Sequence, residues 1–300
     1  MTAILLVTLS AVVHASWNYL GKSRQGALLF FAAASAMGGM MLIPFLAAFS
    51  GSLRLMPAAA ARMLIPAGLF QAVYLIGLGK AYETGDLSAA YPTARALPVL
   101  IVPAVSLILG TGEAVHPQAL SGMVIISAGI LLLPQKSFRS LSFSRTGNRW
   151  MAWALLAAAG TVGYSLVDDA ALAHFRGALD PAVASLHAPV IYSALESLTT
   201  SAFLIMLGLC MKGPSGIVRE AKLLKLRSAC IAGIGIIGAY CLVLIALGFA
   251  RNVSYVVAFR QLSLPIGTFL GMMLLGERMT PPKLAGTLLI LTGLVMVALG

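Results

Sequence analysis

Residues 111–122 read TGEAVHPQALSG, and at residues 275–286 the chain reads LGERMTPPKLAG. The shared positions are 164 residues apart, and they pair Gly112 with Gly276, Glu113 with Glu277, Pro117 with Pro281 and Gly122 with Gly286. At the same offset Gly129 pairs with Gly293, and five further identities run from Tyr91 and Tyr255 to Ile126 and Ile290. A duplicated apolar chain of this kind is typical of a transporter built from two structural repeats.

The composition is that of a membrane protein. Of the 300 residues, 60% are hydrophobic and 10% are charged, whereas a soluble domain carries about 25% charged residues. Apolar stretches of about 18 residues or more indicate membrane-spanning helices. The sequence therefore predicts an all-α membrane protein with ten transmembrane helices, at residues 2–20, 27–49, 63–82, 87–109, 118–134, 150–173, 182–211, 228–250, 253–275 and 281–299.

The net charge of +11 comes from basic residues in short loops between these stretches. Short basic loops are retained on the cytoplasmic side of a membrane and contact anionic lipid head groups. The charge therefore points to the lipid bilayer as a partner and argues against nucleic acid. Two predicted loops hold most of it, one with Lys136, Arg139, Arg145 and Arg149, the other with Lys212, Arg219, Lys222, Lys225 and Arg227.

The basic stretch at residues 135–149 is the linker between two predicted halves, residues 1–134 and residues 150–300. Each half holds five predicted helices. An odd number of helices per repeat forces the second copy into the opposite orientation, which gives two inverted five-helix repeats around a central cavity.

The loop charges also bear on orientation. Lys22 and Arg24 directly follow the first apolar stretch, and the odd-numbered loops carry most of the Lys and Arg residues. The positive-inside rule then predicts an N-terminus outside the cytoplasm, in a bacterial inner membrane.

Arg95 and Arg260 lie inside apolar stretches that are repeat partners, where a charge costs at least about 2.5–3.5 kcal/mol. An inverted repeat would place one arginine near each side of the cavity. There the planar fork of arginine could bind a carboxylate or phosphate of a substrate. The alternative is that each arginine pairs with an interior acid such as Glu196 and locks helices together.

The stretch at residues 182–211 is the most polar of the ten, and Tyr192 and Glu196 share one face of it. A lipid-facing helix could not carry these groups, so we expect this helix to be internal. Glu196 is the first candidate for binding a proton or a substrate ammonium group, and His187 is a further proton-coupling candidate. The alternative for Glu196 is a structural partner of Arg95 or Arg260.

Two further stretches carry polar stripes. His14, Trp17 and Asn18 form one in the first stretch, and Tyr164 and Asp168 are spaced i, i+4 in the sixth. We expect the first stripe and Tyr164 to line the cavity, and Asp168 to be a proton-coupling candidate. Asp169 is expected to be solvated at a helix end.

Two residues complete the predicted substrate site. Gln261 follows Arg260, and Tyr91 is either an aromatic wall of the cavity or an anchor at the membrane interface. Tyr74 and Tyr240 are weaker candidates for the cavity wall.

Other residues have predicted structural roles. Pro92, Pro98, Pro103 and Pro265 interrupt their helices, and Glu113 and Glu277 cap the helices that follow them. The three cysteines, Cys210, Cys230 and Cys241, are expected to be buried and inert. Close helix packing is predicted at Gly122, Gly129, Gly267, Gly271, Gly286 and Gly293.

The chain contains no HExxH, GxSxG or P-loop motif and no cluster of metal ligands. The sequence therefore predicts neither an enzyme nor a cofactor or metal site. The distant alternative is an intramembrane enzyme or a lipid-handling accessory protein. A homodimer is compatible with the sequence, which does not fix the oligomeric state.

The doubled Gly-Glu-x-x-x-Pro segment, each copy followed by a glycine-spaced apolar helix, resembles the EamA-type members of the drug/metabolite transporter superfamily. The resemblance covers essentially the whole chain. His14-Ala15-Ser16-Trp17-Asn18 and Tyr91-Pro92-Thr93-Ala94-Arg95 are similar to a subgroup associated with phosphonate-utilisation gene clusters.

The resemblance implies ten helices in two inverted repeats, alternating access and a small metabolite as substrate, often an amino acid moved outward. It also implies both termini in the cytoplasm, against the loop charges, so orientation stays open. We expect transport of a small polar metabolite with an anionic group, amino-acid-like or an organophosphonate. The alternative is an exporter of hydrophobic or cationic compounds that uses Glu196.

Overall fold

A computed structural model describes the backbone of residues 2–21, 28–84, 87–110, 114–135, 137–138, 149–275 and 278–300. Within these ranges it describes the side chains of all residues except 15–21, 82, 84, 87–91 and 274–275. The predicted roles of Trp17, Asn18, Tyr91, Glu113 and Glu277 therefore lie outside the described side chains.

Every regular element in the described ranges is a helix. The long ones are α1 (Thr2–Gly21), α2 (Leu28–Met41), α5 (Ala58–Thr84), α6 (Leu87–Leu109), α7 (Pro117–Leu132), α8 (Arg149–Gly177), α9 (Pro181–Leu223), α10 (Leu226–Leu247), α12 (Ser263–Leu275) and α13 (Pro281–Leu299). The short ones are α3 (Ile43–Ala48), α4 (Ser50–Arg54), α11 (Val253–Phe259) and the 3₁₀ turn η2 (Arg260–Leu262).

The helices confirm the predicted class, a multi-pass helical membrane protein. In the described residues, eight helical segments are long and apolar enough to cross a membrane. The predicted spans at residues 2–20 and 118–134 are also helical, as α1 (Thr2–Gly21) and α7 (Pro117–Leu132). They are not among the eight, because α7 is shorter and the side chains of α1 are described only over Thr2–His14.

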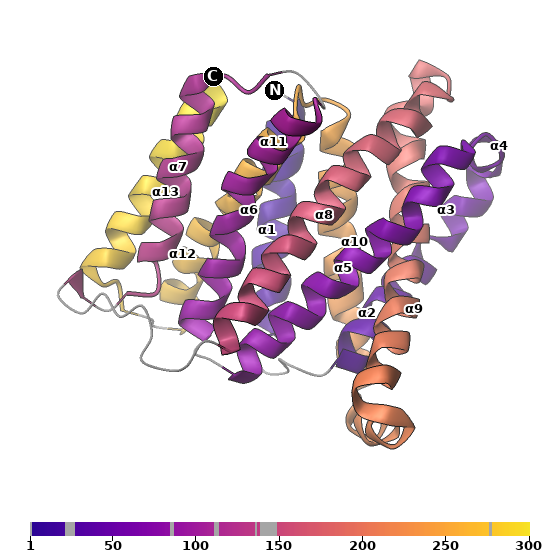
Figure 1. Cartoon of the computed structure of the whole chain (residues 1–300), viewed down its shortest axis with the longest axis horizontal. Helices are drawn as coiled ribbons and strands as arrows, with labels where there is room; N and C mark the ends of the chain where they lie inside the picture. The colour runs from indigo at the N-terminus through magenta and orange to yellow at the C-terminus, as the bar shows by residue number, and fades with distance from the viewer. Residues whose placement is uncertain are drawn as a thin grey trace.

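The helices lie side by side in an elongated bundle (Figure 1). At one end α7 packs against α13, and at the other α2 packs against α9 (Figure 1). Between these ends α5 packs on α8, and α1 packs on α10. Helix α6 also packs on α8, as the α11–η2–α12 segment packs on α1. In the order of the chain, the counterparts are α1 and α8, α2 and α9, α5 and α10, α6 and the α11–η2–α12 segment, and α7 and α13. The contacting pairs remain the same when each helix is exchanged with its counterpart.

Glycines bring α7 and α13 into backbone contact. A Cβ atom on Gly122 would lie 2.6 Å from the Gly293 carbonyl oxygen, and one on Gly129 would lie 2.7 Å from the Gly286 carbonyl oxygen. Side chains at these positions would force the helices apart, so the predicted packing role of the four glycines is confirmed. Gly267 is different, because a Cβ atom there would meet nothing within 4 Å, and its predicted packing role is wrong.

A break interrupts the helix at residues 253–275, where α11 ends in the 3₁₀ turn η2 before α12 begins. Pro265 explains it. Proline has no N–H to donate to the carbonyl of Gln261, four residues earlier, and its ring crowds that carbonyl. In contrast, α6 continues as one helix through Pro92, Pro98 and Pro103, so only the break at Pro265 is confirmed.

The predicted basic loop around residues 212–225 is largely helical, which corrects the sequence interpretation. Helix α9 passes through a kink at Gly213, which has a φ of +67°, and continues to Leu223. Gly213 tolerates this left-handed conformation, and Pro214 is suited to the first turn of the helix that follows. Glu220 in this helical end forms an ion pair with Lys212 and accepts a hydrogen bond from the Leu29 backbone N–H at 3.0 Å.

One smaller prediction is also corrected. None of the cysteines is fully buried, since Cys210 is exposed and Cys230 and Cys241 are half-buried. At the start of the helix after each repeat motif the structure shows a side-chain cap, while Glu113 and Glu277 themselves lie outside the described residues. The His116 ring nitrogen accepts from the Gln118 N–H at the start of α7, and the Thr280 hydroxyl accepts from the Lys283 N–H at the start of α13.

Candidate functional site

Arg95 on α6 is bound to the break in the α11–η2–α12 segment. Its Nε donates to the Gln261 side-chain oxygen at 3.1 Å, and one Nη donates to the Ser263 hydroxyl at 2.8 Å and to the Arg260 carbonyl at 3.2 Å. Only 8% of Arg95 is exposed. A cation is well placed here, because all three groups that it contacts are oxygens, and the Arg260 carbonyl accepts from it in addition to the Ser263 N–H of the 3₁₀ turn.

The acceptors around Arg95 are themselves fixed. The Gln261 amide donates to the Val257 carbonyl at 3.0 Å, which turns its oxygen toward Arg95. The Ser263 hydroxyl donates to the Arg260 carbonyl at 2.9 Å. The predicted anion-binding group Arg95 is therefore a clamp that joins α6 to the broken helix.

Arg260 has a different environment. Its Nη2 donates to the Tyr164 hydroxyl at 3.1 Å, and its guanidinium carbon lies 5.7 Å from the centre of the Tyr164 ring. Among the described residues Tyr164 is its only hydrogen-bond partner, and no carboxylate forms an ion pair with it. The side chain is half-buried. Most of its donors are therefore open to a further partner.

A small pocket lies between the two arginines. The space that water centres can occupy in it is about 10 Å³, enough for at most about one water molecule. Its walls combine two cations with aromatic and amide groups, so it suits a polar, anionic group. The lining residues are Tyr74, Ala94, Arg95, Pro98, Thr161, Tyr164, Val257, Arg260 and Gln261.

Two buried carboxyl groups lie close to this pocket. Asp168 on α8 is 1% exposed and Glu196 on α9 is 0% exposed. The Tyr240 hydroxyl on α10 lies 2.9 Å and 2.8 Å from the two oxygens of Glu196 and also contacts Asp168 Oδ2. In the described part of the chain neither carboxylate forms an ion pair with an arginine, so the predicted structural pairing of Glu196 with Arg95 or Arg260 is wrong.

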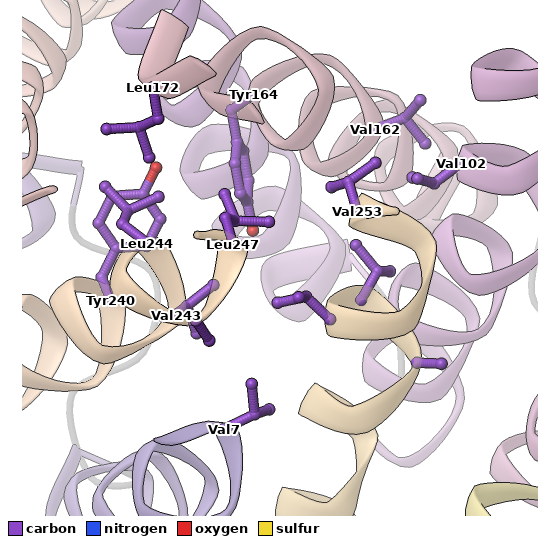
Figure 2. Close-up of a cluster of buried hydrophobic side chains, with 14 of the residues drawn as sticks. Val7, Val102, Val162, Tyr164, Leu172, Tyr240, Val243, Leu244, Leu247 and Val253 are labelled. Atoms are coloured by element: carbon purple, nitrogen blue, oxygen red, sulfur yellow. The ribbon is translucent and has the colours of Figure 1, made fainter. Parts of the chain in front are cut away.

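Tyrosine rings connect the pocket between the arginines with the two buried carboxyl groups. Tyr164 makes edge-to-face contacts with Tyr74, at 6.0 Å between ring centres, and with Tyr240, at 6.1 Å. Tyr164 and Tyr240 belong to a buried apolar cluster with Leu244 and Leu247 (Figure 2). Tyr164 lines the pocket, whereas neither carboxyl group does.

Two other predicted site residues lie near these groups. His14 on α1 is half-buried and interacts electrostatically with Arg95 and Arg260. Tyr192 on α9 is fully buried and lies within electrostatic range of Asp168 and Glu196. Its hydroxyl has no hydrogen-bond partner in the structure as described.

His187 does not join the site. Its Nδ1 lies 2.8 Å from the Ser52 hydroxyl, and its ring stacks on Phe49 with 3.9 Å between ring centres. It precedes Glu196 by nine residues of α9, which places it about 13 Å away along the helix axis. His187 fixes the α3–α4 region against α9.

Two residues of the site were not among its main predicted members: Tyr240 was a weaker candidate, and Ser263 was not a candidate. Tyr240 holds the two carboxyl groups together, and it is the only aromatic residue of α10, a signal that could have raised its rank. Ser263 carried no signal, because its contact with Arg95 depends on the η2 break. No group of three or more potential metal ligands occurs in the part of the chain that the structure describes.

Comparison with known proteins adds the fold. No family model matches the chain, and no curated protein matches it. Among 29 matching chains of solved structures, one crystal structure, described only as that of a protein, is 19% identical, with a TM-score of 0.71. The match covers 100% of this chain and 98% of the other. At that identity the likeness shows a shared fold alone.

Proposed function

We propose that this protein is a secondary transporter, of the EamA type within the drug/metabolite transporter superfamily, for a small polar metabolite with an anionic group. The substrate is amino-acid-like or an organophosphonate, and the membrane is the bacterial inner membrane. The observation that carries the proposal is Arg260, a half-buried guanidinium with one hydrogen-bond partner, beside a pocket between the two halves of the chain. A cation in an apolar membrane bundle costs free energy, and a charged residue found there therefore indicates a functional site.

The packing supports two inverted five-helix repeats. The helix pairs persist when residues 1–134 are exchanged with residues 150–300. Across the α7–α13 interface Gly122 meets Gly293, the repeat partner of Gly129, and Gly129 meets Gly286, the repeat partner of Gly122. Such an exchange is expected of repeats related by a pseudo-twofold axis, and transporters with inverted repeats bind substrate between them. The pocket lies at that place, with walls from α5, α6, α8, α11 and η2.

The contacts support a different role for each arginine. In the proposed mechanism Arg95 keeps the η2 break in place, and Arg260 with Tyr164 binds the carboxylate or phosphonate of the substrate. The pocket of about 10 Å³ is too small for a metabolite. The mechanism therefore requires the site to enlarge, and rocking of the repeats would open it to each side in turn.

The proposal is tested first by measuring ligand binding and then by measuring transport of the ligand across a membrane. Detergent-purified protein is screened by thermal shift against amino acids and organophosphonates, since a ligand of the native state raises the melting temperature. Hits are then assayed for uptake into proteoliposomes. We expect at least one hit whose shift and flux are lost in Arg260→Ala.

Arg62→Ala is the matched control. Arg62 is exposed and bonds only its own helix, at the Ala58 carbonyl, so this variant should bind as the wild type does. Wild-type binding and flux by Arg260→Ala, or the absence of any hit in the screen, would contradict the proposal.

A second candidate function is export of hydrophobic or cationic compounds, favoured by the buried acids Asp168 and Glu196. Under this alternative, cells that produce the protein would resist lipophilic cations, and Glu196→Gln would abolish the resistance. We favour the anionic substrate, because Arg260 lines the pocket and Glu196 does not.

A further inference from the structure

The carboxyl groups of Asp168 and Glu196 share one hydroxyl group. Three helices bring them together, because Asp168 comes from α8, Glu196 from α9 and Tyr240 from α10. The Tyr240 hydroxyl is within hydrogen-bond distance of Asp168 Oδ2 and of both Glu196 oxygens. Both carboxyl groups are sealed from solvent in the described structure.

Counting hydrogens shows that these contacts need one more than the tyrosine supplies. A phenol hydroxyl donates one hydrogen, and an ionised carboxylate can only accept. If both carboxyl groups were ionised, one of them would face the phenol oxygen with no hydrogen between them. One proton on either carboxyl group resolves this, because that group then donates to the phenol oxygen while the phenol donates to the other.

The surrounding charges do not offset two ionised carboxylates. The ionisable groups that act on the cluster are Arg260 on η2, Asp169 and Tyr164 on α8, and Tyr192 on α9. Only Arg260 among them is a cation, and it reaches Asp168 through space, past Tyr164. On the other packed elements, Tyr74 of α5 contacts Tyr164, His14 of α1 acts on Arg260, and α2 contains no titratable residue.

Two further buried atoms support a proton on this carboxyl pair. Asp168 Oδ1 and the Tyr192 hydroxyl have no hydrogen-bond partner among the described residues. Tyr192 is 0% exposed and lies within electrostatic range of both acids. Buried polar atoms are rarely left without a partner, and an unpaired oxygen costs less on a neutral carboxyl group than on an ionised one. The unpaired oxygen of Asp168 therefore fits a carboxyl group that carries the proton on its other oxygen, where it can be donated to the phenol.

We propose that Asp168, Tyr240 and Glu196 form a proton-binding site in which one exchangeable proton is shared between the two carboxyl groups. The site is separate from the anion pocket and coupled to it through Arg260. This inference rests on the proposed function for its role in transport. The presence of the proton itself does not depend on any substrate.

The coupling has a definite sign. An anion bound to Arg260 offsets the positive charge that acts on Asp168, and the carboxyl pair then holds its proton more strongly. By linkage, the proton strengthens anion binding to the same degree. The anion and the proton therefore bind together and move in the same direction, and anion binding takes a proton up from solution.

The first experiment measures the proton without substrate. Infrared difference spectra of the detergent-purified protein are recorded as pH is raised, and the C=O stretch of a protonated carboxyl group is followed. We expect a band that both Asp168→Asn and Glu196→Gln remove or shift, since the proton belongs to the pair. Tyr240→Phe should shift it, and circular dichroism checks that each variant is folded.

Glu83→Gln is the matched control, because Glu83 is an exposed carboxylate paired with Lys80. This variant should keep the wild-type band. A wild-type protein without such a band, or a band that responds to only one of the two buried acids, would overturn the shared proton. Either result would stand whether or not any metabolite is transported.

The second experiment tests the coupling. The pH is set where the infrared band has lost half of its intensity, so that half of the sites lack the proton. In weakly buffered solution with a pH indicator, 2-aminoethylphosphonate or L-glutamate, whichever raises the melting temperature, is added to the protein. We expect up to about half a proton taken up per anion bound, and none in Asp168→Asn or Glu196→Gln. Proton release, or uptake unchanged in both variants, would overturn the coupling while leaving anion binding at Arg260 intact.

Discussion

Arg95 and Arg260 lie one position out of register in the two repeats, yet their surroundings have opposite characters. Arg95 donates three hydrogen bonds to the η2 break, while Arg260 donates one, to Tyr164. Three bonds to the η2 break hold Arg95 in a structural role, whereas the single bond of Arg260 leaves most of its donors for a ligand. The difference teaches that a buried charge in an apolar bundle is not by itself a binding site. The number of its N–H donors without a protein partner decides whether it can bind a ligand.

The largest effect on stability is expected for Arg95→Ala. It removes three charge-assisted bonds and leaves the Gln261 oxygen and the Arg260 carbonyl without this donor. The free energy of unfolding should fall by about 2–4 kcal/mol. Thermal unfolding in detergent, followed by circular dichroism, measures this. A loss equal to that of Arg260→Ala would remove the distinction between the two arginines.

Ser263→Ala should have the next largest effect. The Ser263 hydroxyl accepts from Arg95 and donates to the Arg260 carbonyl, so its loss should cost about 1 kcal/mol. The same melting assay applies. Ser121→Ala is the control, because Ser121 is exposed and bonds only the Pro117 carbonyl within its own helix. Equal melting temperatures for the two variants would show that the clamp around Arg95 does not depend on Ser263.

Arg260→Ala should lower the free energy of unfolding by less than about 1 kcal/mol, since one bond at a half-buried position is lost. Binding of the anionic metabolite should disappear in the same variant. Isothermal titration with a ligand from the thermal-shift screen measures the second effect. An Arg260→Ala protein that melts as early as Arg95→Ala would indicate that Arg260 is also structural.

Tyr164→Phe should have the smallest effect on stability, about 0.5 kcal/mol, because the Arg260 group can turn to water when the hydroxyl is removed. Anion affinity should change by no more than about tenfold, since the guanidinium remains in place. Tyr255→Phe, which removes a hydroxyl that accepts from the His116 N–H, is the control for titration. Loss of all binding in Tyr164→Phe would make the tyrosine, rather than Arg260, the main ligand.

Much of the fold could be predicted from the sequence because it depends on local patterns. The length of the apolar stretches predicted the helices, and the spaced glycines predicted close packing of the repeat-terminal helices, without showing that α7 and α13 are each other's partners. Pro265 predicted a break in its helix for a reason contained within a few residues. The helical end of α9 was missed, because Gly213 and Pro214 can mark a loop as readily as a kink.

The site was less predictable, since it depends on contacts between distant segments. Spacing along one helix placed Tyr192 beside Glu196 and Tyr164 beside Asp168, and both pairs lie in the buried region. No local pattern showed that Tyr240, from a third helix, would join the two acids, or that Ser263 would bind Arg95. His187 shares a helix with Glu196, but the fold brings it to Phe49 instead.

The glycine seam between α7 and α13 has a mechanical consequence. The carbonyl oxygens of each helix leave no room for a Cβ atom on the facing glycines of the other, so the two backbones are in direct contact at these positions and the helices cannot move closer together. We expect this contact to be the fixed part of the bundle. If the protein changes shape as the proposed function requires, the far side of the bundle, around α2 and α9, would then move furthest.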